Sequence, residues 1–132
     1  MRVVADSHAI VWFTQRSSQL SDRAAGALRD AARSERITVS VATFIDLWYV
    51  TQTTQAVTSA DLGRLRAVIE RSRRVEVHAM DLAVADAYTA IPRSVLSDPW
   101  DRFIVATAQV LSVPLVTRDS AIREADLVET IW

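Results

Sequence analysis

The sequence has 132 residues, a formal net charge of −1 and 50% hydrophobic residues, and it contains neither cysteine nor lysine. These values predict one domain with a sizeable core, spanning residues 1–132, and no overall attraction to nucleic acid. They exclude disulfides, thiolate metal sites and lysine chemistry, and no apolar run reaches the roughly 18 residues that a membrane helix needs.

Apolar runs and helical periodicities alternate along the whole chain. In chain order we expect a strand at 2–5, helices at 7–13 and 21–33, a strand at 37–41, helices from 43 to about 52 and at 59–73, a strand at 75–77, helices at 81–91 and from 98, a strand at 115–116, a short helical turn, and a closing strand at 127–131. This alternation predicts an α/β fold: a three-layer α/β/α sandwich with a central, mostly parallel sheet.

Aspartates stand where these strands end or the next helices begin. Asp6 follows the first strand, Asp46 lies in the first turn of the helix after the second, and Asp119 follows the fourth. Asp98 and Asp101 open the helix that precedes the fourth strand. Because ligands of parallel sheets bind at the carboxyl ends of the strands, we expect these five carboxylates to converge.

Helix capping offers an ordinary explanation for most of these acids. In the stretch Asp98-Pro99-Trp100-Asp101, an aspartate N-cap, a proline at the first helical position and an acid in the first turn all favour a helix start. Asp46 would pair with an N-capping Thr43, and Asp119 would cap the turn after it. Asp6 resists this explanation, because it interrupts an apolar run where burial of a carboxylate is costly.

Several carboxylates in one pocket would repel each other, and some would be protonated near neutral pH unless a cation held them. In a chain without lysine or cysteine, the cation that best suits such oxygen ligands is Mg²⁺ or Mn²⁺. A metal ion of this kind activates water and stabilises the charge of a phosphodiester under attack. The acids together therefore favour a metal-dependent reaction on phosphate esters.

Four short motifs follow one another along the chain. They are Asp6-Ser7-His8, Ser40 with Ile45-Asp46-Leu47, Asp98-Pro99-Trp100-Asp101-Arg102, and Thr117-Arg118-Asp119. In order and spacing these motifs resemble those of a PIN-domain ribonuclease of the VapC type, the toxin half of bacterial type II toxin–antitoxin pairs. The resemblance covers nearly the whole chain.

The resemblance implies an acidic Mg²⁺ site, with Mn²⁺ able to substitute, that cleaves RNA. It implies that Asp6, Asp46, Asp101 and Asp119 are catalytic, metal-binding acids, and that Asp98 is an additional aspartate that caps the helix and supports the site. Asp101, one turn further in, is expected to face the metal. The resemblance also implies a homodimer and a small antitoxin whose tail lies over the active-site groove.

Two positions depart from the family's pattern. Position 46 is aspartate where the family usually has glutamate, and the shorter side chain puts direct metal ligation by Asp46 in doubt. The histidine that commonly precedes the Asp-Pro motif is Leu96 here. Neither departure removes the acidic core.

Other polar residues beside the acids have two interpretations each. Ser7 and Thr117 either hydrogen-bond the carboxylates or RNA, or simply cap helices and turns. Arg102 and Arg118, each next to a site acid, are candidates for positioning RNA. For His8 and His78 we expect structural roles, and for the arginines at positions 64, 66, 71, 73 and 74 a solvated helix face rather than an RNA contact.

Two wider expectations concern location and partners. The first residues, MRVVADSHAIVWF, lack the length and the cleavage site of a signal peptide. Because the chain has no cysteine, we expect the reducing cytoplasm as its location. The apolar stretches AIVWF and FIDLWYV favour an interface with a partner. A rival interpretation of the whole chain is a non-catalytic PIN-like binding module that uses the acidic cleft to hold a basic partner.

Overall fold

The computed structural model describes residues 1–132, with strands and helices in the predicted order. The elements are β1 (Val3–Ala5), α1 (Ser7–Thr14), α2 (Asp22–Ser34), β2 (Ile37–Ser40), α3 (Ala42–Thr53), α4 (Ser59–Arg71), β3 (Val75–His78), α5 (Leu82–Ala90), α6 (Pro99–Leu111), β4 (Leu115–Val116), α7 (Ser120–Ala125) and β5 (Thr130–Ile131). The five strands form one sheet in the order β3-β2-β1-β4-β5, and all neighbours are parallel. The predicted α/β class is confirmed.

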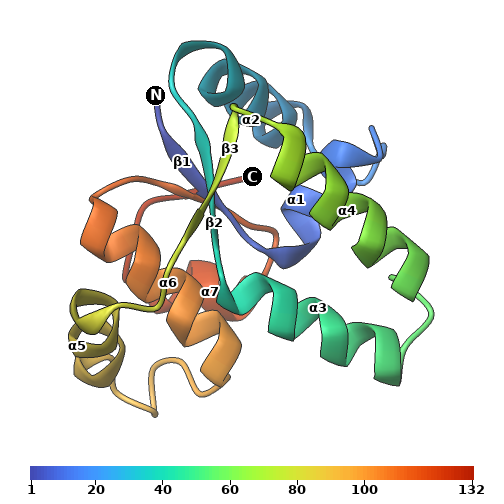
Figure 1. The fold of residues 1–132 in the computed structure, drawn as a ribbon. Coiled ribbons are helices and arrows are strands. Elements are labelled where there is room, and N and C mark those ends of the chain that lie inside the picture. Colours follow the sequence, from blue (N-terminus) through green and yellow to red (C-terminus); the bar gives the residue numbers. More distant parts are fainter.

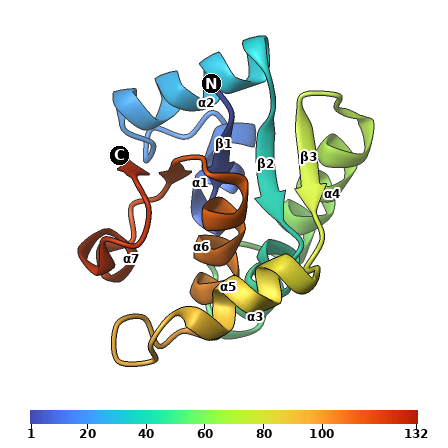
Figure 2. The same ribbon diagram turned by 90° about the vertical axis from the view of Figure 1, so that its left-hand side faces the viewer.

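Helices cover both faces of the sheet and make the predicted three layers (Figures 1 and 2). The alternation of side chains along β1 separates two cores. Val3 and Ala5 belong to a cluster of 16 buried residues beneath α1, α2 and α4, whereas Val4 belongs to a cluster of 10 on the side of α5 and α6. Helix α3 continues from the carboxyl end of β2 and contacts α1, α4 and α6. The helices therefore enclose the sheet and leave its carboxyl edge available for a site.

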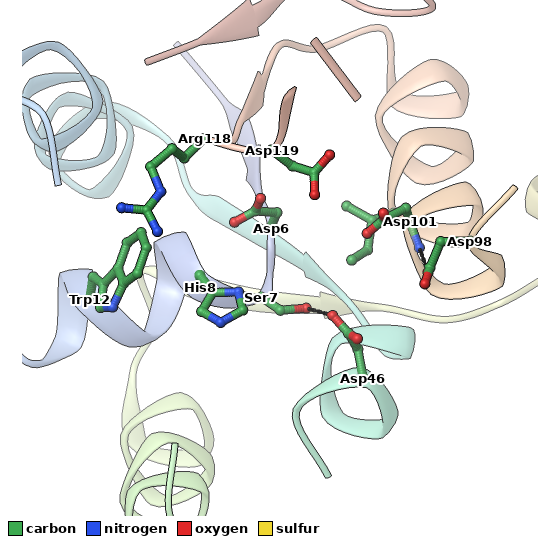
Figure 3. A pocket seen from close by; sticks show the side chains of 10 residues that line it. Asp6, Ser7, His8, Trp12, Asp46, Asp98, Asp101, Arg118 and Asp119 are labelled. Carbon is green, nitrogen blue, oxygen red and sulfur yellow. Dashed lines mark hydrogen bonds between the residues drawn. The ribbon is translucent and has the colours of Figure 1, made fainter. Parts of the chain in front are cut away.

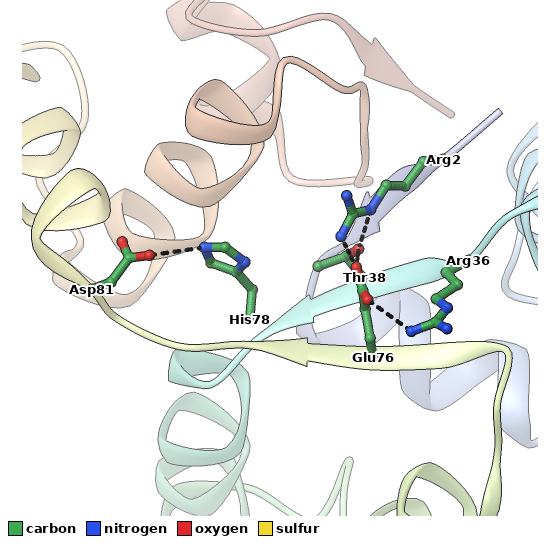
Figure 4. Close-up of polar contacts among 6 residues, drawn as sticks. All are labelled: Arg2, Arg36, Thr38, Glu76, His78 and Asp81. Atoms are coloured by element: carbon green, nitrogen blue, oxygen red, sulfur yellow. Dashed lines mark hydrogen bonds and ion pairs between the residues drawn. The ribbon is translucent and has the colours of Figure 1, made fainter.

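A network of polar side chains runs from the start of β1 across β2 to β3, on the α6 side of the sheet (Figure 4). Arg2 Nε donates to Thr38 Oγ1 (3.0 Å), and Thr38 Oγ1 donates to Glu76 Oε1 (3.0 Å). Glu76 also pairs with Arg2 and, at 3.2 Å, with Arg36. Thr38 is fully buried, and these contacts satisfy its hydroxyl group in both directions.

The closing strand is shorter than predicted, two residues in place of residues 127–131. Its only neighbour, β4, is itself two residues long, so no further ladder partner exists. Asp126 ends α7 in the left-handed region with φ of 52°, which turns the chain before it can extend. None of the helices has both the length and the apolar composition needed to cross a membrane.

Candidate active site

A pocket of about 350 Å³ lies at the carboxyl edge of the sheet (Figure 3). It is lined by Asp6, Ser7, His8, Trp12, Asp46, Asp98, Asp101, Ile104, Arg118 and Asp119. The structure therefore brings together all five aspartates that the sequence pattern selects. They come from the ends of β1 and β4, from the second turn of α3, and from the N-cap and first turn of α6.

Asp6 is the most buried of these acids, with 9% of its surface exposed. One carboxylate oxygen, Oδ1, accepts a hydrogen bond from the backbone N–H of Ala9 (2.9 Å) and so caps α1. The other, Oδ2, accepts from the hydroxyl group of Thr117, which in turn accepts from the N–H of Asp119 (3.0 Å). Thr117 thereby ties the end of β1 to the end of β4, and Asp6 to Asp119.

Asp98 and Asp101 make different contacts at the start of α6. Asp98 Oδ1 accepts from the N–H groups of Trp100 (2.9 Å) and Asp101 (3.0 Å), and Pro99 occupies the first helical position. The carboxylate of Asp101 accepts no hydrogen bond from the protein and lines the pocket. Burial raises the pKa of Asp101 to about 8, and the negative charges of Asp98, Asp119, Asp46 and Asp6 add to the rise.

Asp46 does not form the capping box that its spacing suggested. Helix α3 begins at Ala42, one residue early, and Thr43 lies inside the first turn with no hydrogen-bond partner for its hydroxyl group. Asp46 Oδ2 instead accepts a hydrogen bond from Ser7 Oγ (2.6 Å), across the pocket from α1. Burial raises the pKa of Asp46, although this hydrogen bond opposes the rise.

Asp119 and Asp98 each cap a helix and also line the pocket. Asp119 accepts a hydrogen bond from the N–H of Ile122 (3.0 Å) through Oδ1 and caps α7, yet it also lines the pocket. Asp98 likewise uses only Oδ1 for its helix. In both residues the second oxygen accepts no hydrogen bond from the protein, so one side chain serves the fold and the site together.

The donor set fits a hard divalent cation. Burial raises the pKa of Asp6 as it does for Asp46 and Asp101. A bound cation would offset this effect by stabilising the ionised carboxylates. No three acidic or histidine side chains are arranged as a metal site by themselves. A divalent cation such as Mg²⁺, which keeps several water ligands, would therefore be held by one or two of these carboxylates together with water or substrate phosphate.

Comparison with known proteins identifies the family. The family model described as PIN domain matches residues 3–127. The chain belongs to the PIN domain family. Ribonuclease VapC22 of Mycobacterium tuberculosis (strain ATCC 25618 / H37Rv) is 30% identical to this PIN domain over 122 residues, which cover 92% of this chain and 89% of that protein. The predicted resemblance to VapC-type PIN domains is confirmed.

Solved structures show the same fold at lower identity. VapBC2 from Rickettsia felis, solved with a DNA fragment from its promoter, matches with a TM-score of 0.70 and 15% identity, covering 98% of this chain and 97% of that one. FitAcB from Neisseria gonorrhoeae matches with a TM-score of 0.63 and 22% identity, covering 97% and 95%.

One predicted RNA contact of this PIN domain is wrong. Arg102 is 5% exposed and does not line the pocket. Its guanidinium donates to the backbone carbonyls of Leu96 (2.9 Å) and Tyr88 (3.0 Å) and lies 4.5 Å from the centre of the Tyr88 ring. Arg102 therefore holds the loop between α5 and α6, and both the burial of its side chain and its hydrogen bonds to the backbone keep it from contacting RNA. Leu96, which replaces the family's usual histidine, is part of the core.

Two pocket residues were missed as site candidates. Trp12 received no site role, and His8 was expected to be purely structural, yet both line the pocket with their rings 5.4 Å apart. The available signal was their spacing: residues four apart share a helix face, and Asp6 is the N-cap of this helix.

The arginine-rich helix lies away from the pocket, as expected for a solvated face. Arg64 pairs with Asp61, and Arg66 pairs with Glu70 (3.0 Å). Arg71 donates to the backbone carbonyl of Ala67 (3.2 Å). These contacts all lie within α4, so they use the arginines to stabilise that helix.

Proposed function

We propose that this PIN domain is a metal-dependent endoribonuclease that hydrolyses RNA phosphodiester bonds. The observation that carries the proposal is the convergence of five aspartates in one pocket at the carboxyl edge of the sheet. The 30% identical relative is named a ribonuclease, which supports RNA as the substrate.

Asp6, Asp101 and Asp119 would hold the metal ion, with Asp46 and Asp98 completing the set. We propose Mg²⁺ as the ion, with Mn²⁺ able to replace it. When bound, such an ion lowers the pKa of a water molecule and neutralises charge on the phosphate.

The remaining groups of the site orient these acids. Thr117 holds the carboxylate of Asp6, and Ser7 holds that of Asp46 at 2.6 Å. Because each hydroxyl group donates its single proton to a carboxylate, it favours the ionised form that a cation needs. Asp46 would act directly or through a water molecule.

Cleavage of RNA by the purified chain, free of any partner, tests the proposal. We expect cleavage of a mixed cellular RNA pool with Mg²⁺ or Mn²⁺, and its loss with EDTA or in Asp6→Asn. Asp30→Asn, which makes the same charge change at an exposed position on α2, should leave cleavage intact. RNA that stays whole with both metals, together with an Asp6→Asn protein that is as toxic on expression as the wild type, would refute the proposal.

The rival function is a binding module that uses the acidic pocket to hold a basic partner without turnover. The observation in its favour is that no three side chains form a metal site by themselves. Calorimetric titration with Mn²⁺ separates the two functions: heat of binding that Asp101→Asn abolishes supports the nuclease, and no uptake supports the rival.

We further propose that the chain acts in the cytoplasm as the toxin of a VapBC-type pair. Solved relatives described as VapBC complexes support this assignment. A basic side chain from a small antitoxin would be attracted to the five acids and would displace the metal, so inhibition would be electrostatic as well as steric. An antitoxin encoded next to this chain should bind it and stop cleavage. Binding without inhibition would remove the claim.

A homodimer is the expected assembly. Large apolar side chains are exposed on α3 and around β3 and α5: Ile45 (44%), Trp48 (49%), Tyr49 (47%), Val77 (42%), Met80 (43%) and Leu82 (84%). Apolar surface of this kind marks an interface. The other stretch expected to face a partner, AIVWF, is instead buried from Ala9 to Trp12. Light scattering at micromolar concentration should give the mass of a dimer, and a monomer would refute it.

A further inference from the structure

Arg118 is the only arginine that lines the acidic pocket, yet it pairs with none of the acids there. No hydrogen bond or ion pair joins its guanidinium to Asp119, its neighbour in sequence, or to Asp6. The side chain is exposed, so its donors are accessible from the pocket. An arginine whose purpose was to neutralise the carboxylates would be expected to contact them.

Trp12 holds this guanidinium instead. The central carbon of the Arg118 guanidinium lies 4.5 Å from the centre of the Trp12 ring. Trp12 itself is only 7% exposed, and it packs against Trp132 at 6.0 Å and His8 at 5.4 Å between ring centres. A buried indole is a fixed platform, and the cation–π attraction keeps Arg118 on it without using any N–H donor.

The pocket consequently has two ends of opposite character (Figure 3). Arg118 and Trp12 stand at one end, and Asp46, Asp98 and Asp101 stand at the other, with Asp6 and Asp119 between them. A cation is attracted to the acidic end and an anion to the basic end. The planar guanidinium presents its donors in a fork that matches two oxygens of one phosphate.

We propose that Arg118, positioned by Trp12, binds an RNA phosphate adjacent to the one that is cut. This inference rests on the proposed ribonuclease function and specifies its substrate class: a strand with at least two consecutive phosphodiesters. The scissile phosphate lies at the acids, and the neighbouring phosphate lies on the guanidinium. Arg118 is thus a positioning residue that selects polynucleotide over an isolated diester.

Kinetics on two substrates test the contact. Arg118→Gln should lower kcat/KM on an RNA oligonucleotide about tenfold more than on bis(p-nitrophenyl) phosphate, which has a single phosphate, with the loss mainly in KM. The slope of log KM against log salt concentration on RNA should fall by about 0.7, as for one lost phosphate contact. Trp12→Phe, which keeps a weaker ring, should show a smaller effect in the same direction.

Arg123→Gln is the matched control, because Arg123 is exposed on α7 outside the pocket. It should change neither the substrate preference nor the salt slope. Equal melting temperatures of the variants and the wild type would exclude a folding defect.

Replacing single RNA phosphates with uncharged methylphosphonates shows which phosphate Arg118 binds. RNA oligonucleotides carrying one methylphosphonate at a time should bind more weakly to the wild type, in EDTA, when the neutral linkage adjoins the scissile one. Arg118→Gln should bind that oligonucleotide no more weakly than the unmodified strand. If Arg118→Gln loses equal activity on both substrates, or if no linkage shows this interaction, the inference is wrong while the ribonuclease function stands. A wild type that cuts neither substrate overturns the proposed function, and this inference with it.

Discussion

Two pairs of adjacent residues in this chain each consist of one aspartate and one arginine, but their arginines make different contacts. Asp101-Arg102 opens α6, and Arg118-Asp119 precedes α7. Both aspartates line the pocket, and both arginines lie 4.5 Å above an aromatic ring. The difference is in the guanidinium donors: Arg102 gives two of them to backbone carbonyls in the interior, and Arg118 gives none to the protein.

The backbone explains the difference. On a helix, consecutive residues point about 100° apart, so Asp101 faces the pocket while Arg102 turns toward α5. In the extended chain after β4, consecutive side chains alternate, so Thr117 contacts Asp6 and Arg118 points to Trp12. A position beside a pocket aspartate therefore says little about whether an arginine is free to bind a ligand.

The largest expected effect is the loss of RNA cleavage on substitution of Asp101, which we do not expect for Arg102. Asp101→Asn should reduce metal-dependent RNA cleavage by at least about a thousandfold, or about 4 kcal/mol, because it removes a carboxylate that would hold the metal. The same substitution should leave stability equal or higher, since it removes a carboxyl group whose ionisation the folded protein disfavours. Cleavage assays and urea denaturation of one preparation check both statements. Loss of stability would mean that Asp101 serves the fold.

Arg102→Met should have the reverse profile. It leaves the carbonyl of Leu96 without a donor in the core and removes the contact with Tyr88, so we expect a loss of about 3 kcal/mol of unfolding free energy. Urea denaturation measures the loss. Arg102→Lys should recover part of it, and cleavage per folded molecule should be maintained. A loss of cleavage without a loss of stability would restore Arg102 as an RNA contact.

A third effect is the pH dependence of stability that Asp101 causes. The pKa of Asp101 rises from 3.8 to about 8 in the folded protein, so the folded state keeps a proton that the unfolded chain has lost. Because the unfolded chain releases this proton at a lower pH, the free energy of unfolding is highest below the unfolded pKa. It falls as the pH rises through the folded pKa. In EDTA the melting temperature should therefore fall between about pH 4 and about pH 8.

Two controls accompany the pH series. Asp101→Asn should flatten the slope, and Mg²⁺ should reduce it, because a bound cation favours the ionised carboxylate. Differential scanning fluorimetry across the series gives the measurement. A wild type and Asp101→Asn with parallel curves would contradict the assignment.

The smallest expected effect is the stability change of Arg118→Met. An exposed side chain that makes no hydrogen bond to the protein should contribute within about 0.5 kcal/mol to folding. Denaturation beside Arg102→Met gives a direct comparison of the two arginines. A loss as large as that of Arg102→Met would mean that Arg118 supports the fold through Trp12 and is not held free for a ligand.

The sequence by itself determined the fold class and the members of the acidic site. Short apolar runs alternating with helical periods dictate a parallel sheet, and parallel strands end at one edge. Because each aspartate follows a strand or starts a helix, local position was sufficient to place all five in one pocket.

Only the tertiary structure decided how these residues are held. The hydrogen bond from Thr117 to Asp6 joins residues 111 positions apart, and that from Ser7 to Asp46 joins residues 39 apart. Local patterns instead suggested Thr43 as the partner of Asp46, and the shortness of β4 limited the closing strand in a way that its own residues do not show. Burial of Arg102 and exposure of Arg118 depend on which segments pack around each one. Contacts of this kind arise when distant segments pack together, and periodicity within a segment carries no information about them.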